Sequence, residues 1–263
     1  MKNMNQDERR RYLIRRLLDE DGRYRGMEVP PDAEGQKTLL RGLMNIRPPK
    51  SIDNEFLEIQ DEYLKEETRR KGITDIEDLK PVSDGICIRQ GDITTLKCDA
   101  IVNAANSGMT GCYVPNHKCI DNCIHTFAGV QLRLCCEELM EEQGYEEPTG
   151  RAKITPGYNL PCRYVIHTVG PIIAGHVTKN DRKLLASCYR SCLETAAGNS
   201  LQSIAFCCIS TGEFHFPNDE AAGIAVETVR EFMAEETSVK KVVFNVFKDI
   251  DREIYGGLLR SDE

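Results

Sequence analysis

The spacing of apolar residues changes near residue 83, and this change limits the possible folds more than any other feature. Before it, "DERRRYLIRRLLDE", "DAEGQKTLLRGLMNIR" and "SIDNEFLEIQDEYLKEETRRKG" place apolar residues at helical intervals between charged positions. After it, short apolar segments alternate with amphipathic segments of helical period. Strands that alternate with helices predict an α/β sheet with helices on both sides.

This change predicts two regions, a helical N-terminal extension over residues 1–82 and an α/β domain over residues 83–263. In the extension, Ser51 is expected to open the third helix and Gly72 to close it. In the domain we expect strands in "GICIRQ", "AIVNAAN", "SIAFCCIS" and "KKVVFNVF", two more joined at "NLP", and one long helix from about residue 119 to Gly144. Binding sites in such folds lie beyond the carboxyl ends of the strands.

The charge is unevenly distributed. Residues 1–80 carry 17 Lys/Arg against 18 Asp/Glu, and residues 81–263 carry 17 against 24, a net charge of −7 within the total of −8. So acidic a domain disfavours general nucleic-acid binding, which needs a basic face. Phosphate groups would have to be bound by backbone amides and helix N-termini.

The N-terminus lacks the apolar core of a secretory signal and no apolar run is long enough to span a membrane, so a cytoplasmic location is expected.

Twelve cysteines are present, and most lie among apolar residues, where a reduced cysteine packs as a small hydrophobe. The exception is "GCYVPNHKCIDNCIH", which places three cysteines and two histidines within residues 111–125. Cys112, His117 and Cys119 supply two thiolates and one imidazole, a set that selects zinc. Three protein ligands leave the fourth tetrahedral position open, as in catalytic zinc sites, unless Cys123 closes it. The alternatives are core packing or a redox pair.

Two loops follow predicted strands at the expected binding edge. The first runs from "VNAAN" to the helix that begins near Asp121. The second is "STGEFHFP", residues 210–217, between a buried strand and a helix. Its small polar residues suit a backbone that turns its amides toward an anion, with a helix N-terminus behind them.

Five segments in order give the chain a recognisable resemblance. They are "GDIT" (91–94), "IVNAAN" (101–106), "IDNCIHTFAG" (120–129), "ITPGYNLPCRYVIHTVGP" (154–171) and "ISTGEFHFP" (209–217). Residues from about 83 to 260 thereby resemble macrodomains, and closely the MacroD-type branch, whose members bind ADP-ribose and remove it from modified proteins. The resemblance implies a three-layer α/β/α fold around a mixed sheet of about six strands.

One stretch departs from that branch. Where MacroD-type proteins carry a glycine-rich run, this chain carries "GCYVPNHKCIDN". In this it resembles the zinc-containing microbial subfamily, which also has an N-terminal helical extension. Cys123 and His125 match residues of metal-free relatives, so we expect His125 to pack within its helix. Members of the subfamily are paired with a sirtuin-like transferase and a lipoyl-carrier protein, which implies a carrier protein as substrate.

The resemblance also implies roles for individual residues. Asp121 would position or deprotonate the attacking water, with a helix N-cap as its alternative role, and Asn106 would assist it. Zinc would orient the distal ribose and offset charge in the transition state. Phe247 would stack on adenine and Phe216 would pack on the distal ribose, with core packing as the alternative for both. The remaining expected substrate contacts are Asp92 and Ile93 at adenine, Asn103 and Asn106 at the distal ribose, Thr110, and Ser210, Thr211, Gly212, Glu213 and Phe214 at the diphosphate. His167 is expected to be a satisfied strand-end histidine.

These features favour a zinc-dependent hydrolase that removes ADP-ribose from mono-ADP-ribosylated proteins. The main alternative is a module that binds ADP-ribose without cleaving it, which would need neither Asp121 nor the metal ligands. Deacetylation of O-acetyl-ADP-ribose would use the same pocket. The acidic domain disfavours binding of nucleic acid or poly(ADP-ribose).

Overall fold

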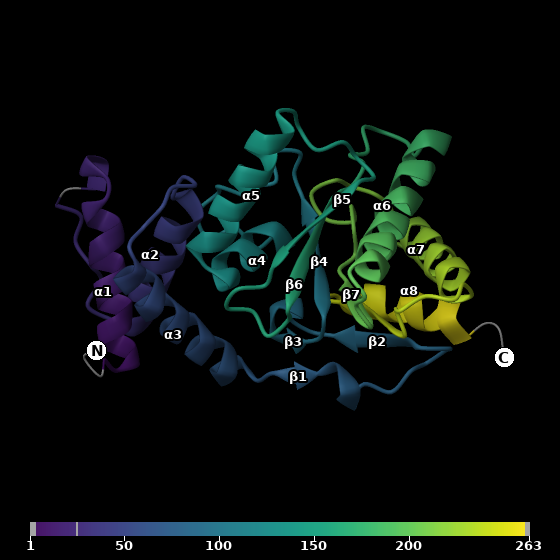
Figure 1. The fold of residues 1–263 in the computed structure, drawn as a ribbon, viewed down its shortest axis with the longest axis horizontal. Helices are drawn as coiled ribbons and strands as arrows, with labels where there is room; N and C mark the ends of the chain where they lie inside the picture. Colours follow the sequence, from purple (N-terminus) through teal and green to yellow (C-terminus); the bar gives the residue numbers. More distant parts are fainter. Residues whose placement is uncertain (1–3, 25, 261–263) are drawn as a thin grey trace.

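Three helices open the chain, as predicted. The computed structural model describes residues 4–24 and 26–260. The helices are α1 (Gln6–Asp19), α2 (Ala33–Ile46) and α3 (Asn54–Lys71), and they gather at one end of the molecule (Figure 1). The prediction that Ser51 opens α3 is wrong, because the carboxylate of Asp53 caps the helix by accepting the Phe56 amide at 3.0 Å. Gly72 ends α3 as expected, with a positive φ of 89°.

A six-stranded mixed sheet forms the centre of the molecule. The strand order is β2-β8-β7-β4-β6-β5, and only β5 runs antiparallel to its neighbour. The central strands are buried on both faces, which explains why they read as continuous apolar runs. The strands are β2 (Ile86–Gln90), β4 (Ala100–Ala105), β5 (Ala152–Pro156), β6 (Tyr164–Val169), β7 (Ser203–Phe206) and β8 (Lys241–Val246), and β1 (Thr74–Asp75) pairs separately with β3 (Leu96–Lys97).

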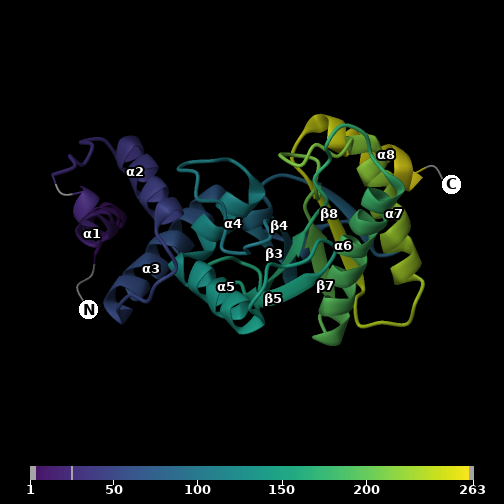
Figure 2. The same cartoon turned by 90° about the horizontal axis from the view of Figure 1, so that it is seen from above.

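Helices cover the sheet on two sides, which confirms the three-layer α/β/α architecture. Both views place the sheet between α4 and α5 on one side and α6, α7 and α8 on the other (Figures 1 and 2). The single long helix expected up to Gly144 is in fact two helices, because Gly129 at φ 100° breaks it. The helices are α4 (Ile120–Ala128), α5 (Val130–Gln143), α6 (Lys179–Gly198), α7 (Asn218–Met233) and α8 (Asp249–Arg260).

The extension and the α/β domain share contacts rather than meeting at a bare linker. Val130, the first residue of α5, belongs to the apolar cluster formed by the three N-terminal helices. Its amide donates to Gln60 Oε1 of α3 at 3.0 Å, which caps an α5 N-terminus that has no side-chain cap of its own. The strand β1 lies before the expected boundary at residue 82, yet it pairs with β3 of the domain.

The cysteines outside the metal-ligand stretch are free, and most are buried in the main core, which confirms their packing role.

Among residues 4–24 and 26–260, none of the helices has the length and apolar content that crossing a bilayer requires.

We expect Val130→Ala to lower the free energy of unfolding by about 2 kcal/mol, because it removes apolar volume from a cluster that joins two parts of the fold. Urea denaturation would measure the change, with Val82→Ala, at a position that is 39% exposed, as the control. Both regions should unfold in one transition. Two separate transitions, with only the first moved by Val130→Ala, would contradict the shared packing.

Candidate active site and metal centre

The candidate site lies where the parallel strands end. Asn103 is in β4, in register with His167 of β6, and Asn106 follows β4 directly. Helix α4 begins against this edge and brings Asp121 to both asparagines. Asn103 Nδ2 donates to Asp121 Oδ1 at 2.8 Å, and Asn106 Nδ2 lies 3.4 Å from Asp121 Oδ2. Three residues that the sequence analysis assigned to one site therefore meet.

Burial controls the protonation of this group. Asp121 is 5% exposed, and burial raises the pKa of its carboxyl to about 6, although the Asn103 hydrogen bond and the charge of Arg133 oppose the shift. A carboxyl with a pKa near 6 suits a general base at neutral pH. The alternative role of Asp121 as the helix N-cap is wrong, because Cys119 occupies that position and its Sγ accepts the Asn122 amide at 3.4 Å.

The orientation of Asn103 is set by His167. One amide hydrogen of Asn103 goes to Asp121, and the other points to His167 Nδ1 at 3.1 Å. His167 Nε2 lies 2.9 Å from Thr155 Oγ1, so the imidazole has partners on both nitrogens, as expected of a satisfied histidine. This arrangement leaves Asn103 Oδ1 buried without a hydrogen-bond partner in the described part of the chain, residues 4–24 and 26–260. Buried polar atoms are rarely left unpaired, so this oxygen is an open acceptor for a ligand hydroxyl.

The three expected metal ligands converge. The ligand atoms of Cys112, His117 and Cys119 lie within 4.8 Å of one another, and Cys112 Sγ is 3.4 Å from His117 Nδ1. Tetrahedral zinc, with Zn–S near 2.3 Å and Zn–N near 2.0 Å, requires sulfur and nitrogen ligands about 3.6 Å apart. The other imidazole nitrogen, Nε2, lies 3.6 Å from Glu213 Oε1, which is near but beyond hydrogen-bond distance. The residues present therefore fit zinc.

The chemistry of the thiols supports a cation here. Burial, together with neighbouring Cys112 and Asp121, raises the pKa of Cys119 to about 12, although the hydrogen bond from the Asn122 amide opposes this shift. Two thiolates at this place would therefore need a compensating positive charge. Cys123 lies outside the group, and its Sγ is 3.4 Å from the guanidinium of Arg41. It does not close the tetrahedron in this structure.

A second group of potential ligands, His125, Cys136 and His167, is fully buried. Both nitrogens of His167 already have partners, so this imidazole has no lone pair to spare for a metal. His125 is buried in α4, as expected of a packing residue, with its Nε2 3.6 Å from Asp121 Oδ1.

The loop between β7 and α7 spans residues 207–217, and two residues of positive φ shape its backbone. Ser210 and His215 adopt positive φ values of 65° and 58°, and Phe216 N closes the turn on Ser210 O at 2.9 Å. The amides of Gly212, Glu213 and Phe214 have no hydrogen-bond partner among residues 4–24 and 26–260. Free amides ahead of a 16-residue helix are the kind of backbone groups that bind phosphate, and diphosphate binding at this loop stays a prediction.

The expected adenine contacts lie at the other end of this edge, where β2 and β8 finish side by side. Asp92 Oδ1 accepts from the Thr94 amide at 3.0 Å, and Oδ2 from Lys71 Nζ of α3 at 3.1 Å. Burial raises the pKa of Asp92, but the Thr94 hydrogen bonds and the Lys71 ammonium outweigh it, so the pKa is lowered. Phe247 follows β8 and is 77% exposed, which excludes core packing and leaves its face open to a ligand.

Other expected contacts lie elsewhere or play structural roles here. Phe216 is 1% exposed and packs in the main core, as its alternative interpretation had it. The side chain of Ile93 is also buried, and Thr110 offers its carbonyl to Arg133 Nε at 2.7 Å. Contact of these residues with substrate stays a prediction.

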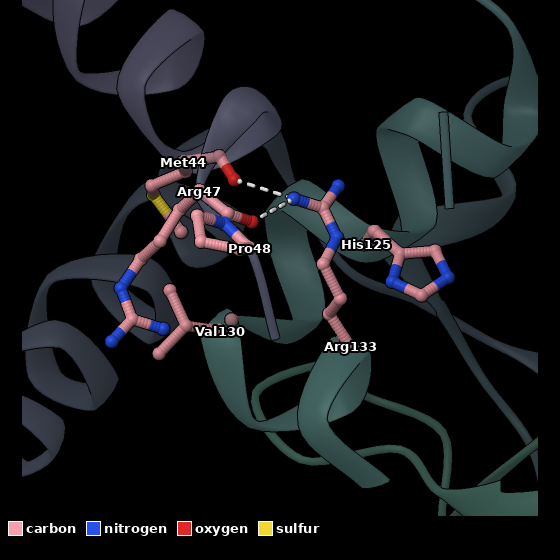
Figure 3. Close-up of a pocket in the computed structure, with 7 residues that line it drawn as sticks. Met44, Arg47, Pro48, His125, Val130 and Arg133 are labelled. Atoms are coloured by element: carbon pink, nitrogen blue, oxygen red, sulfur yellow. Dashed lines mark hydrogen bonds between the residues drawn. The ribbon is translucent and has the colours of Figure 1, made fainter. Parts of the chain in front are cut away.

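Sequence reasoning missed the residues that hold the metal ligands in place. Arg41 and Asn45 of α2 reach residues 116–123, and Arg133 of α5 reaches the end of α2 (Figure 3). A buried arginine within the apolar run "VQLRLCC" was the one available signal, because apolar helix faces rarely carry an unpaired charge. Arg41 and Asn45 look like ordinary polar helix residues.

A family model for the macro domain matches residues 102–225. A protein from Treponema medium, named protein-ADP-ribose hydrolase, is 59% identical over 260 residues, which cover 97% of this chain and 100% of the relative. The chain belongs to the macrodomain family. A Staphylococcus aureus (strain MSSA476) protein of the same name is 52% identical, with 95% of each chain covered.

Solved macrodomains share the fold. The Trypanosoma brucei macrodomain in complex with ADP-ribose superposes with a TM-score of 0.63 at 29% identity, covering 81% of this chain and 93% of that one. Membership of the macrodomain family and the fold class predicted from the sequence are thereby confirmed, and the zinc-containing subfamily stays a prediction.

The buried imidazoles predict acid sensitivity. Burial lowers the pKa of His167 to about 3 and that of His125 well below its usual value, so the folded chain stays unprotonated where the unfolded chain, with pKa near 6.5, takes up protons. Stability should therefore fall as the pH drops from 6.5 toward 3, by up to about 1.4 kcal/mol per pH unit for each histidine. The raised pKa of Asp121 acts in the opposite direction below pH 6.

Urea unfolding at pH 7, 6 and 5 would isolate the contribution of His167. The dependence of the free energy of unfolding on pH should be weaker in His167→Gln, since glutamine does not titrate. The difference in slope should correspond to the uptake of up to one proton fewer on unfolding. His176→Gln, at an exposed position, is the matched control for replacing a histidine by glutamine. Equal slopes in wild type and His167→Gln would contradict a neutral buried His167.

Proposed function

We propose that this macrodomain is a zinc-dependent hydrolase that releases ADP-ribose from mono-ADP-ribosylated proteins. The hydrolase class follows from relatives of equal length that are named protein-ADP-ribose hydrolase. The observation that carries the zinc dependence is the convergence of Cys112, His117 and Cys119 at the start of the helix that bears Asp121. Zinc bound there would supply Lewis-acid stabilisation next to the distal ribose.

The chain's own residues account for binding of the nucleotide. The free amides of the loop 207–217 would bind the diphosphate without any cationic side chain, which suits a domain of net negative charge. Exposed Phe247 would stack on adenine, and Asp92 would accept from its amino group after exchanging the Lys71 contact. The unpaired Asn103 Oδ1 would accept from a distal-ribose hydroxyl, with the exposed Asn106 beside it.

Asp121 would act on the water that attacks the anomeric carbon. Asn103 and Asn106 hold its two oxygens, so the carboxylate is oriented before substrate arrives. A proton passes from the water to the carboxylate as the bond to the ribose forms and the bond to the protein side chain breaks. A module that only binds ADP-ribose has no use for a buried carboxylate with a raised pKa, so this site favours the enzyme over the reader.

The substrate protein is the part of the proposal that rests on resemblance alone. The expected target is a lipoyl-carrier protein modified by a sirtuin-like transferase, in a cytoplasmic setting. Deacetylation of O-acetyl-ADP-ribose in the same pocket is the second candidate activity, because the diphosphate and ribose contacts would serve both substrates.

Release of ADP-ribose from a mono-ADP-ribosylated protein tests the role of the metal. We expect one zinc per chain by elemental analysis, loss of turnover after chelation, and its return on adding zinc. Cys119→Ala should lose the metal and at least 100-fold in turnover, whereas Cys123→Ala, next to the site but outside the ligand group, should keep both. Full turnover after verified removal of zinc would show that the three ligands only shape the loop and that zinc takes no part in the reaction.

A separate measurement tests Asp121. Asp121→Ala should lower kcat by about 10²–10⁴-fold, the usual contribution of a general base, while zinc content and ADP-ribose affinity stay near those of the wild type. Isothermal titration with ADP-ribose is the control for binding. If kcat is unchanged while the variant is folded, Asp121 is not the base, and tight ADP-ribose binding without turnover in the wild type would favour the reader.

A further inference from the structure

The metal loop, defined as residues 111–119, is contacted by a helix of the N-terminal extension. Arg41 of α2 donates from Nη2 to the carbonyl oxygen of His117 at 2.8 Å and to Asn122 Oδ1 at 3.0 Å. The same nitrogen lies 3.4 Å from Cys123 Sγ. One guanidinium thus connects the backbone of a metal-ligand residue to the first turns of α4.

Asn45, one helical turn after Arg41, contacts the same loop. It is 1% exposed, its Oδ1 accepts the Asn116 amide at 2.9 Å, and its Nδ2 donates to Thr126 Oγ1 of α4 at 2.8 Å. Between the two, Gly42 lies against the loop so closely that a Cβ would be 3.2 Å from Asn116 Nδ2. Asn116 itself has a φ of 57°, an uncommon conformation that its surroundings must hold.

Helix α2 is in turn fixed to the domain by Arg133. Its guanidinium donates to the carbonyl oxygens of Met44 at 3.2 Å and Arg47 at 2.6 Å (Figure 3). It also donates to that of Asn45 at 2.6 Å, so three carbonyls at the C-terminus of α2 are paired. The Nε of Arg133 donates to Thr110 O, directly before the metal loop, at 2.7 Å. A small crevice lined by Met44, Arg47, Pro48, His125, Gly129, Val130 and Arg133 marks this junction.

Few contacts within the loop itself could replace these. The backbone of His117 is held by its own amide, which donates to Val114 O at 3.2 Å, and by the bond from Arg41 to its carbonyl. Asn122 Nδ2 adds bonds to the carbonyls of Cys112 and Val114 at 3.3 and 3.0 Å. The loop has no helix or strand of its own between Cys112 and Cys119.

We propose that Arg41 and Asn45 are positioning residues that hold the metal loop in the conformation in which its three ligands meet. This inference rests on the proposed zinc site. A loop that is already ordered does not lose conformational freedom when the ion binds, so its affinity for zinc is higher. Two residues of the N-terminal extension therefore contribute to the zinc affinity of the metal site.

Competition with a chromophoric zinc chelator would measure the dissociation constant of zinc from the full-length chain. Arg41→Gln and Asn45→Ala should each weaken zinc binding by about 10–100-fold, the usual effect of partners behind the ligands. Arg41→Lys keeps the charge but not the forked geometry, and should weaken it less. Lys37→Gln is the matched control, because Lys37 lies one turn earlier on α2 and contacts Glu34 and Glu67 instead.

Two further readouts separate positioning from general stability. Turnover of the Arg41 and Asn45 variants should recover at saturating zinc, and amide hydrogen exchange at residues 112–119 of the zinc-free chain should be faster than in wild type. Zinc affinity within twofold of wild type, with unchanged exchange in this loop, would overturn the proposal. A wild-type chain that binds no zinc would instead reject the zinc centre, while the exchange experiment would still decide whether α2 holds the loop.

Discussion

The hydrogen bond between Asn103 and Asp121 joins the end of β4 to the start of α4, and the organisation of the site depends on it. Cys119 caps this helix and Asp121 lies in its first turn, so the oriented carboxylate and a metal ligand are close neighbours in the chain. The cost is a desolvated carboxyl with a pKa near 6. Such a group would weaken an ordinary core, and a buried carboxyl with a raised pKa is typical of sites where a carboxyl takes part in chemistry.

The rest of the site follows from the parallel sheet. Because β2, β8, β7 and β4 run in the same direction, the turns after them lie at one edge, and residues far apart in the chain share one surface. The amides of the loop 207–217 and the ligands of the metal loop approach each other where Glu213 comes within 3.6 Å of His117. Under the proposed function, this acidic domain would bind a diphosphate with backbone groups alone.

Sequence reasoning predicted the architecture because alternating apolar periods report directly on strands and helices. The family resemblance assigned Asn103, Asn106 and Asp121 to one site, and the three residues do meet. The spacing of Cys112, His117 and Cys119 predicted a group of metal ligands, and their ligand atoms converge. Sequence reasoning failed at Gly129 and at Asp53, where one residue decides a helix boundary that periodicity does not mark. It also missed Arg41 and Asn45, because their partners lie more than 70 positions away and nothing local distinguishes them.

The place of Val130 has a consequence for how the chain is made. The three N-terminal helices leave the ribosome before α5 does. Their apolar cluster lacks Val130, and Gln60 lacks the Val130 amide that it accepts, until about 60 further residues have been synthesised after α3 ends. Contacts of such long range form late. The N-terminal helices therefore stay incompletely packed until the start of α5 has been synthesised. The metal loop precedes α5 in the chain, so it has been synthesised before these helices complete their packing.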